Sequence, residues 1–173
     1  MIVEGNFQSQ MDQKEILPAN FSEFPYVCIC TRLDHYIDRC IPWHWHPSFE
    51  LDYVEEGEIL LQTPSKTYQL QKGDLIFINS GIMHLLQAPD RKSGCVEYSQ
   101  IFDMEFLSGI HSGLLEKKYI FPILQCRELD SFLIRPDTRR RISMAEKILD
   151  MIELNRTEPA GYEFELRALL GRF

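Results

Sequence analysis

Two short polar motifs between residues 43 and 84 constrain the fold of this chain more than any other feature. The first motif is the run His44-Trp-His-Pro-Ser-Phe-Glu50, in which His44, His46 and Glu50 are separated by two and four residues. Because side chains of an extended strand alternate between its two faces, these three polar side chains share one face. The opposite face then carries the aromatic side chains of the motif, which are Trp43, Trp45 and Phe49.

The second motif is the run Gly73-Asp-Leu-Ile-Phe-Ile-Asn-Ser-Gly-Ile-Met-His84, which supplies a later histidine after a glycine-containing turn. Together the motifs offer three imidazoles and one carboxylate, which suit a divalent transition metal such as Zn, Fe, Mn or Ni. The candidate ligands are His44, His46, Glu50 and His84. The same groups can instead bind a polar ligand by hydrogen bonds, or serve as buried structural residues. No cofactor is certain from the sequence.

The spacing of these residues resembles the two cupin motifs. The first motif is matched from His44 to Gly57. It consists of two histidines separated by one residue, a glutamate after three further residues and a glycine after six more. The second motif is matched from Gly73 to His84, with Asn79 where proline is usual. The resemblance implies a mainly β fold, namely the cupin double-stranded β-helix, or jelly-roll barrel, here followed by two C-terminal α-helices.

A narrower resemblance covers about residues 22–173. The runs Tyr53–Gly57 and Tyr68–Asn79, with Met83 and His84, are similar to the effector-binding domain of AraC-type transcription regulators. The resemblance implies a homodimer that senses a small-molecule effector, such as a sugar, inside the barrel. His44, His46, Glu50 and His84 would then contact the effector. DNA would be bound only through a helix-turn-helix domain downstream of residue 173.

The charge distribution agrees with a sensor that does not itself bind DNA. Residues 1–60 contain eleven acidic and three basic side chains, whereas residues 61–173 contain fifteen of each. Binding to a phosphate backbone depends on Lys and Arg, and a chain with a net charge of −8 does not supply the necessary excess.

The cysteines and the apolar runs indicate a cytoplasmic protein without a membrane partner. An odd number of irregularly spaced cysteines argues against a disulfide framework; they are Cys28, Cys30, Cys40, Cys95 and Cys126. Cys28 and Cys30 share a strand face and are interpreted as small apolar core residues. The apolar runs are too short to span a bilayer, and no signal peptide opens the chain.

Short apolar runs separated by turn residues predict the strands of the barrel. The predicted strands are 26–33, 59–63, 68–70, 75–78 and 96–102. Residues 103–118 have weaker periodicity and predict short helices or turns. A further strand is predicted over residues 121–126.

From Asp137 onward the apolar residues recur at helical spacing. Asp137 is the predicted N-cap of a first helix, which Thr157-Glu-Pro159 ends, and a second amphipathic helix follows from Tyr162 to Phe173. These helices either cover the barrel or form a dimer interface, and we expect a dimer. The apolar residues expected at that interface are Ile148, Ile152, Leu166, Leu169 and Leu170.

The expected organisation has three parts. Residues 1–21 are an N-terminal arm over the pocket or a disordered tail, residues 22–135 are the effector-binding barrel, and residues 136–173 are the helical dimerisation segment. The main alternative function is a metal-dependent cupin enzyme, such as a dioxygenase or sugar isomerase, whose metal would polarise the substrate or activate oxygen. A simple sugar-binding cupin is a third candidate.

Overall fold

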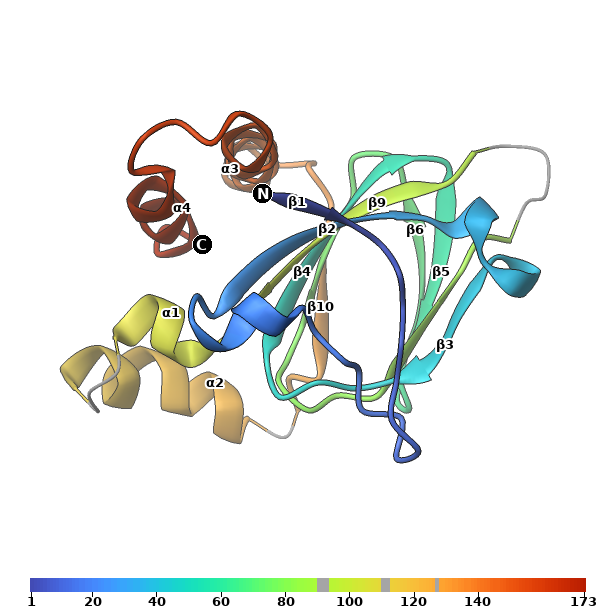
Figure 1. The fold of residues 1–173 in the computed structure, drawn as a ribbon, viewed down its shortest axis with the longest axis horizontal. Helices are drawn as coiled ribbons and strands as arrows, with labels where there is room; N and C mark the ends of the chain where they lie inside the picture. The colour runs from blue at the N-terminus through green and yellow to red at the C-terminus, as the bar shows by residue number, and fades with distance from the viewer. Residues whose placement is uncertain (90–93, 110–112, 127) are drawn as a thin grey trace.

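The strands of this chain form two sheets that face each other as a barrel (Figure 1). The computed structural model describes residues 1–89, 94–109, 113–126 and 128–173. The strands in this part are β1 (Ile2–Glu4), β2 (Tyr26–Arg32), β3 (Cys40–His44), β4 (Phe49–Glu56), β5 (Glu58–Gln62), β6 (Thr67–Gln71), β7 (Leu75–Ile78), β8 (His84–Gln87), β9 (Val96–Phe102) and β10 (Ser131–Ile134). The larger sheet has the order β1-β2-β9-β4-β7-β10 and the smaller sheet has the order β3-β8-β5-β6. The predicted fold class is therefore confirmed.

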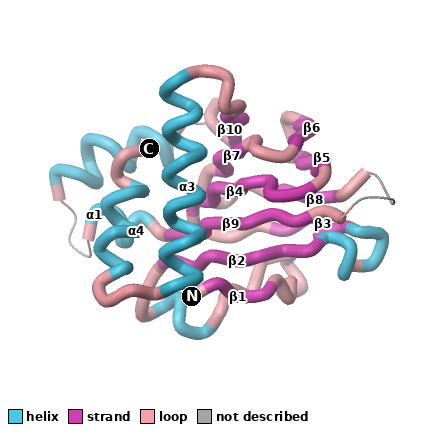
Figure 2. The backbone as a smooth tube through the Cα atoms, turned by 90° about the horizontal axis from the view of Figure 1, so that it is seen from above, coloured by secondary structure: helices cyan, strands magenta, loops and turns pink. Residues whose placement is uncertain are grey.

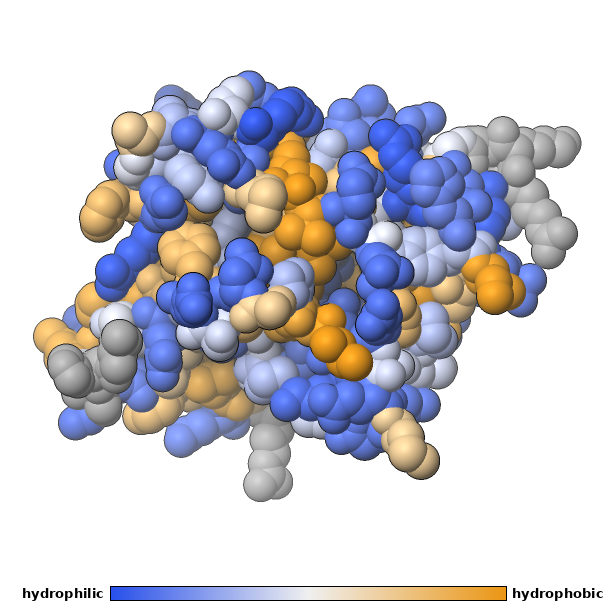
Figure 3. Space-filling model, viewed as in Figure 1, coloured by the Kyte–Doolittle hydropathy of each residue, from blue (hydrophilic) through white to orange (hydrophobic). Residues whose placement is uncertain are grey.

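Helices lie on the outer face of the larger sheet, at one end of the barrel. They are α1 (Met104–Ser108), α2 (Phe121–Gln125), α3 (Arg139–Thr157) and α4 (Tyr162–Leu170), with a π-helical turn at Glu116–Ile120. Figure 2 shows α3 lying across the strands of the larger sheet with α4 beside it. In the space-filling view of Figure 3, apolar side chains gather in a band between this helical layer and the barrel.

The central strand β4 is buried on both faces and separates two apolar cores. Phe49, Leu51 and Tyr53 point toward the helices, where they belong to the same buried cluster as residues of α3 and α4. Val54, on the other face, belongs to a second cluster between the two sheets. Burial of one such apolar side chain contributes about 1.5–3 kcal/mol, so both layers are held firmly on this strand.

The strand predictions are largely confirmed, but the predicted strand at 121–126 is wrong. Residues Phe121–Gln125 form helix α2, with Pro122 in its first turn. Proline lacks the N–H that a sheet requires and favours the first turn of a helix. The strand at this end of the sheet is instead β10, which was not predicted and pairs antiparallel with β7. The short helix α1 agrees with the prediction for residues 103–118, of which residues 110–112 lie outside the described part.

Both C-terminal helices are confirmed, with one correction at the start of α3. Thr138, rather than Asp137, is the N-cap, because its Oγ1 accepts a hydrogen bond of 3.3 Å from the backbone N–H of Arg141. Asp137 forms an ion pair with the Arg141 side chain instead, at 2.9 Å. The helix ends at Thr157, as the Thr-Glu-Pro sequence predicts, and Glu158 adopts a left-handed conformation that was not predicted.

The apolar faces of the C-terminal helices are mostly used inside the chain. Ile148, Ile152, Leu166 and Leu170 are buried in the core beneath the helices, and Leu169 is partly buried there. Ile142 and Leu149, which belong to the same helical pattern, are more than two-fifths exposed. The helices therefore cover the sheet and also present some apolar surface to solvent.

Asn79 explains how this chain does without the usual proline of the second motif. Its buried amide donates hydrogen bonds to the carbonyls of Ile123 at 2.9 Å and Leu129 at 2.8 Å. These bonds attach the end of β7 to the segment that carries α2. A proline at this position could not make them, because it has no side-chain donor.

All five cysteines have free thiols, and Cys28 and Cys30 are buried as expected. In the part of the chain that the structure describes, no helix combines the length and apolar character needed to cross a membrane.

Candidate functional site

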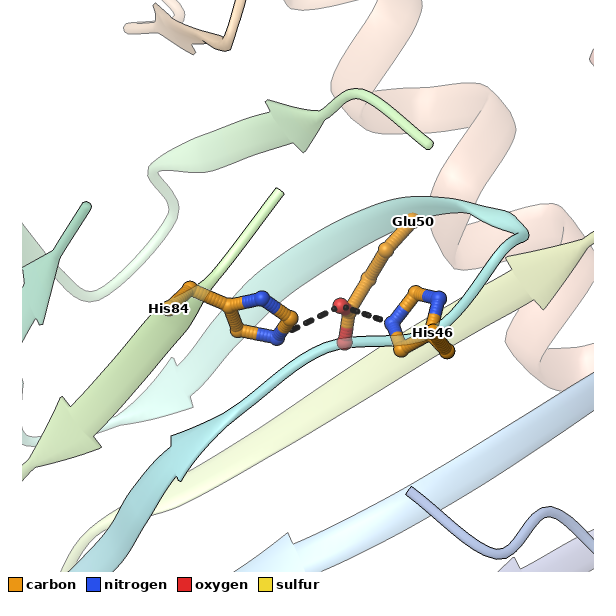
Figure 4. A group of neighbouring side chains, drawn as sticks. All are labelled: His46, Glu50 and His84. Atoms are coloured by element: carbon orange, nitrogen blue, oxygen red, sulfur yellow. Dashed lines mark hydrogen bonds and ion pairs between the residues drawn. The ribbon is translucent and has the colours of Figure 1, made fainter. Parts of the chain in front are cut away.

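Three of the predicted site residues meet inside the barrel (Figure 4). His46 follows β3, Glu50 lies on β4 and His84 begins β8, and all three are buried. One oxygen of Glu50, Oε2, lies 2.9 Å from His46 Nε2 and 3.1 Å from His84 Nε2. The possible ligating atoms of the three residues lie within 4.8 Å of one another. The sequence motifs therefore do converge in space.

Backbone carbonyls orient the imidazole rings. The Nδ1 atoms of His44, His46 and His84 are hydrogen-bonded to the carbonyl oxygens of Pro42 at 2.9 Å, Ser48 at 3.1 Å and Ile82 at 2.9 Å, respectively. Because a carbonyl only accepts, each Nδ1 carries the proton. The Nε2 atom of each ring is then left available for a ligand or a second proton.

The buried His84 Nε2 is the clearest sign that the group fits a cation. Despite its short distance to Glu50, this nitrogen has no hydrogen-bond partner among the described residues. It lies within ion-pair distance of the Glu50 carboxylate, at 3.1 Å. A metal ion bound between His46, Glu50 and His84 would resolve this arrangement, and imidazole with carboxylate is a suitable donor set for divalent transition metals.

His44 lies beside this group but is not one of its three members. Its ring centroid is 4.0 Å from that of His84 and 6.5 Å from that of His46. His44 and His84 are directly opposite each other on β3 and β8, which explains their proximity. Its role as a fourth ligand stays a prediction.

The electrostatics of the group favour one buried ion pair. Burial alone would lower the pKa of His46, but the Glu50 carboxylate raises it above the usual value. Burial alone would raise the pKa of Glu50, but the imidazoles of His84 and His46 lower it well below the usual value. Burial, together with His84, lowers the pKa of His44 to about 3, so that His44 is neutral at physiological pH.

A cavity of about 280 Å³ adjoins this group. Its wall includes His44 and Glu50 together with inward-facing residues of β2 and β9. Residues 3–8 and 15–18 of the N-terminal segment complete the lining. The volume lies slightly below the usual range for small-molecule sites, so the cavity has room only for a small compound.

The N-terminal segment is attached to the barrel beside the motif histidines. β1 pairs in parallel with β2, and Phe7 packs edge-on against the ring of His44 at a centroid distance of 4.8 Å. Trp45, between His44 and His46 in sequence, donates its backbone N–H to Gln13 O at 3.1 Å and accepts from Glu15 N at 2.9 Å. The conformation of this segment is therefore linked to the position of the two histidines.

Sequence reasoning missed three acidic side chains near the cluster. Asp52 and Glu97 are each 1% exposed, and Glu15 reaches the cavity from the N-terminal segment. Asp52 could have been found from the period-two alternation of β4, because it shares a face with Glu50. Nothing in the sequence pattern places Glu15 or Glu97 in the site, since their proximity depends on the packing of distant segments.

Burial raises the pKa of each of these carboxyls. Together with the nearby Glu50, it raises the pKa of Asp52 well above its usual value and that of Glu97 to about 8. Burial raises the pKa of Glu15 to about 7, although the nearby His46 opposes this shift. Both oxygens of Asp52 and the Oε2 atom of Glu97 have no hydrogen-bond partner within the described ranges.

Comparison with known proteins identifies the family. The family model described as "AraC-like ligand binding domain" matches residues 27–154, which is well over half of the chain. The chain therefore belongs to the family of AraC-like ligand-binding domains, as the sequence motifs predicted.

A curated relative is the uncharacterized HTH-type transcriptional regulator YdeC of Bacillus subtilis (strain 168), which is 30% identical over 82 residues. The matched region is 47% of this chain and 28% of YdeC, so the chain spans less than a third of that protein. Similar solved structures include a cupin-2 domain containing protein from Shewanella frigidimarina NCIMB 400, with TM-score 0.37, 22% identity and coverage of 45% of this chain and 70% of that one. Another is a predicted oxalate decarboxylase from Thermotoga maritima, with TM-score 0.35 and 23% identity. The match covers 38% of this chain and 56% of that protein.

The buried Glu97 carboxyl should make stability depend on pH. Because burial raises its pKa from 4.5 to about 8, the folded chain keeps a proton that the unfolded chain releases across this interval. The free energy of unfolding should therefore fall as pH rises from about 4.5 to about 8, by on the order of 1 kcal/mol per pH unit. Urea unfolding of the wild type and of Glu97→Gln at several pH values measures this, and the variant should show a shallower slope. Equal slopes would contradict the prediction.

Metal binding should depend on His46. At a metal concentration 100-fold above Kd, Zn²⁺ or Mn²⁺ should stabilise the wild type by about 2.7 kcal/mol. His46→Ala should abolish this stabilisation in thermal unfolding, whereas His35→Ala, which removes an exposed histidine, should keep it. If the metal raised the thermal stability of both variants equally, it would be bound somewhere other than at His46.

Proposed function

We propose that this chain is the effector-sensing and dimerisation part of an AraC-type transcriptional regulator. It would bind a small polar effector in the barrel and control a helix-turn-helix domain elsewhere in the full protein. The observation that carries the proposal is the cavity that joins the buried His/Glu group to the N-terminal segment. Membership of the AraC-like ligand-binding family supports it.

The polar groups of the cavity suit an effector with several hydrogen-bonding groups, such as a sugar. The Glu50 carboxylate and the Nε2 atom of the neutral His44 can accept hydrogen bonds from hydroxyl or amine groups. If His46, Glu50 and His84 hold a divalent transition metal, it supplies a Lewis acid that binds an oxygen of the effector. In either case these side chains orient the effector against one wall of the barrel.

The N-terminal segment offers a route from the effector to the helices. Its residues 3–8 line the cavity, while Ile2, at its start, packs against the core beneath α3 and α4. An effector that contacts this segment favours one of its arrangements over others. Because the same segment contacts the helical layer, the change would reach the part of the domain next to the expected DNA-binding region.

The exposed apolar residues of α3 are the proposed dimer contact. Ile142 is 44% exposed and Leu149 is 43% exposed, and their seven-residue spacing places them on one helix face. Of the residues first expected at the interface, Ile148, Leu166 and most others are already buried within the chain. We therefore place the contact on the outer face of α3, with the buried residues supporting it from below.

A metal-dependent cupin enzyme is the second candidate function. The observation that favours it is the convergence of His46, Glu50 and His84, whose possible ligating atoms lie within 4.8 Å of one another and suit a catalytic as well as a sensory metal. The two functions differ in what happens to the bound compound. A sensor releases its effector unchanged, whereas an enzyme converts its substrate.

Capture of small molecules from a cell extract tests the function and separates these candidates. We expect the wild-type chain, dialysed against the extract, to enrich a compound that mass spectrometry recovers unchanged. Glu50→Gln should reduce the enrichment at least tenfold, since it removes the central charge of the site, whereas His35→Ala should retain it. Depletion of the compound with appearance of a new product would favour the enzyme, and enrichment of no compound would contradict both.

The dimer contact should be sensitive to charge at Leu149. Leu149→Glu should shift the chain from dimer to monomer in analytical ultracentrifugation, because it places two carboxylates in an apolar contact. Its free energy of unfolding should change by only about 0.5 kcal/mol, since Leu149 is exposed within the chain. Phe164→Glu alters an apolar residue that is 80% exposed on α4 and should leave the dimer intact. A monomeric wild type, or a dimeric Leu149→Glu, would contradict the proposal.

A further inference from the structure

One wall of the barrel cavity carries a buried carboxyl group with one oxygen that no described part of the chain hydrogen-bonds. Glu97 is 1% exposed, lines the cavity and has no hydrogen-bond partner for its Oε2 atom among the described residues. A buried carboxyl oxygen without a hydrogen-bond partner is unfavourable, and such atoms are uncommon in folded proteins. Its place in a ligand cavity indicates that the partner comes from the ligand.

The rest of the lining points to the charge of that ligand. The carboxyl side chains that line the cavity are Glu4, Glu15, Glu50 and Glu97. No lysine or arginine belongs to the lining that the structure describes, and its one histidine, His44, is neutral at physiological pH. An anionic ligand would therefore find carboxyl groups and no lysine or arginine partner in this lining, whereas a cation would find carboxyl oxygens that can accept its hydrogen bonds.

We propose that this cavity recognises a small organic cation, a protonated amine, and that Glu97 accepts hydrogen bonds from its ammonium group. The inference rests on the proposed function, because it names the chemical class of the effector. The hydroxyl groups of Thr31 and Ser99 lie on the same wall of the cavity as Glu97. The rings of Phe7 and Tyr36 also line the cavity and suit a cation, which is attracted to aromatic faces.

The proposed ammonium site is separate from the His/Glu group. Glu97 pairs with Val54 of β4, whereas Glu50 pairs with Ile101, four residues further along β9. Four residues correspond to about 13 Å between Cα atoms along a strand, although the carboxyls are close enough for Glu50 to raise the pKa of Glu97. Glu97 is not one of the three residues whose possible ligating atoms converge, so a metal held by His46, Glu50 and His84 would leave the Oε2 atom of Glu97 without a partner. A bound amine could contact Glu97 at one end and the His/Glu group at the other.

Two sets of compounds with matched carbon skeletons test the charge preference directly. The first set is D-glucosamine, D-glucose and D-glucuronate, and the second is 1,4-diaminobutane, 1,4-butanediol and succinate. Isothermal titration calorimetry is carried out on the full chain after removal of metal with EDTA, at pH 8, where the Glu97 carboxyl, with a pKa of about 8, is about half ionised. We expect the amine of at least one set to bind at least tenfold more tightly than its neutral and acidic counterparts.

Substitutions at Glu97 assign the preference to this residue. Glu97→Gln keeps the shape of the side chain and should reduce the preference for the amine to less than threefold. Glu97→Asp keeps the charge and should retain the preference. Glu58→Gln, which removes an exposed carboxylate on β5, should behave as the wild type does. Circular dichroism checks that each variant is folded.

The alternative outcomes are distinct. Tighter binding of a neutral or acidic compound, or an amine preference that Glu97→Gln leaves intact, overturns the cation inference and leaves the effector site standing. Binding by none of the six compounds also overturns the inference. The capture from cell extract then decides the proposed function independently, because it does not depend on the charge of the ligand.

Discussion

The alternation of side chains along β4 is the constraint on which the rest of the structure depends. This strand is in the interior of the larger sheet and is buried on both faces. Phe49 and Leu51 anchor the helical layer on one face, while Glu50 and Asp52 enter the barrel on the other. A shift of one residue in its pairing would exchange the two sets and destroy both the core and the site. The binding site and the helical layer therefore share one rigid element, which couples them mechanically.

The barrel interior combines a firmly oriented polar group with carboxyls that lack partners. The backbone carbonyls fix the imidazoles of His46 and His84, so the geometry around Glu50 exists before any ligand arrives. Asp52 and Glu97 are buried nearby at a cost in stability, because neither is fully hydrogen-bonded by the described chain. Natural proteins retain such destabilising groups where binding needs them. The arrangement suits the proposed effector site, in which a bound ligand would supply the missing partners.

Several elements could be predicted because their signals are local. The strand Leu75–Ile78 agrees with its prediction residue for residue, since turn residues bracket a short apolar run. The end of α3 at Thr157 was also predictable from the proline that follows. Residues 121–126 were assigned wrongly because a short apolar run fits a strand or a buried helix equally well. The role of Pro122 was the local signal that could have corrected the assignment.

The sequence alone determined the family, the barrel and the identity of the central polar residues, because alternation and spacing are properties of the local chain. It also determined that two amphipathic helices follow the barrel. Only the tertiary structure decided that His46 and His84 share one oxygen of Glu50, and that His44 lies beside them. It alone brought Glu97 into the cavity and placed residues 3–8 along its wall. These contacts join segments far apart in the chain, and their geometry follows from sheet pairing and packing rather than from local pattern.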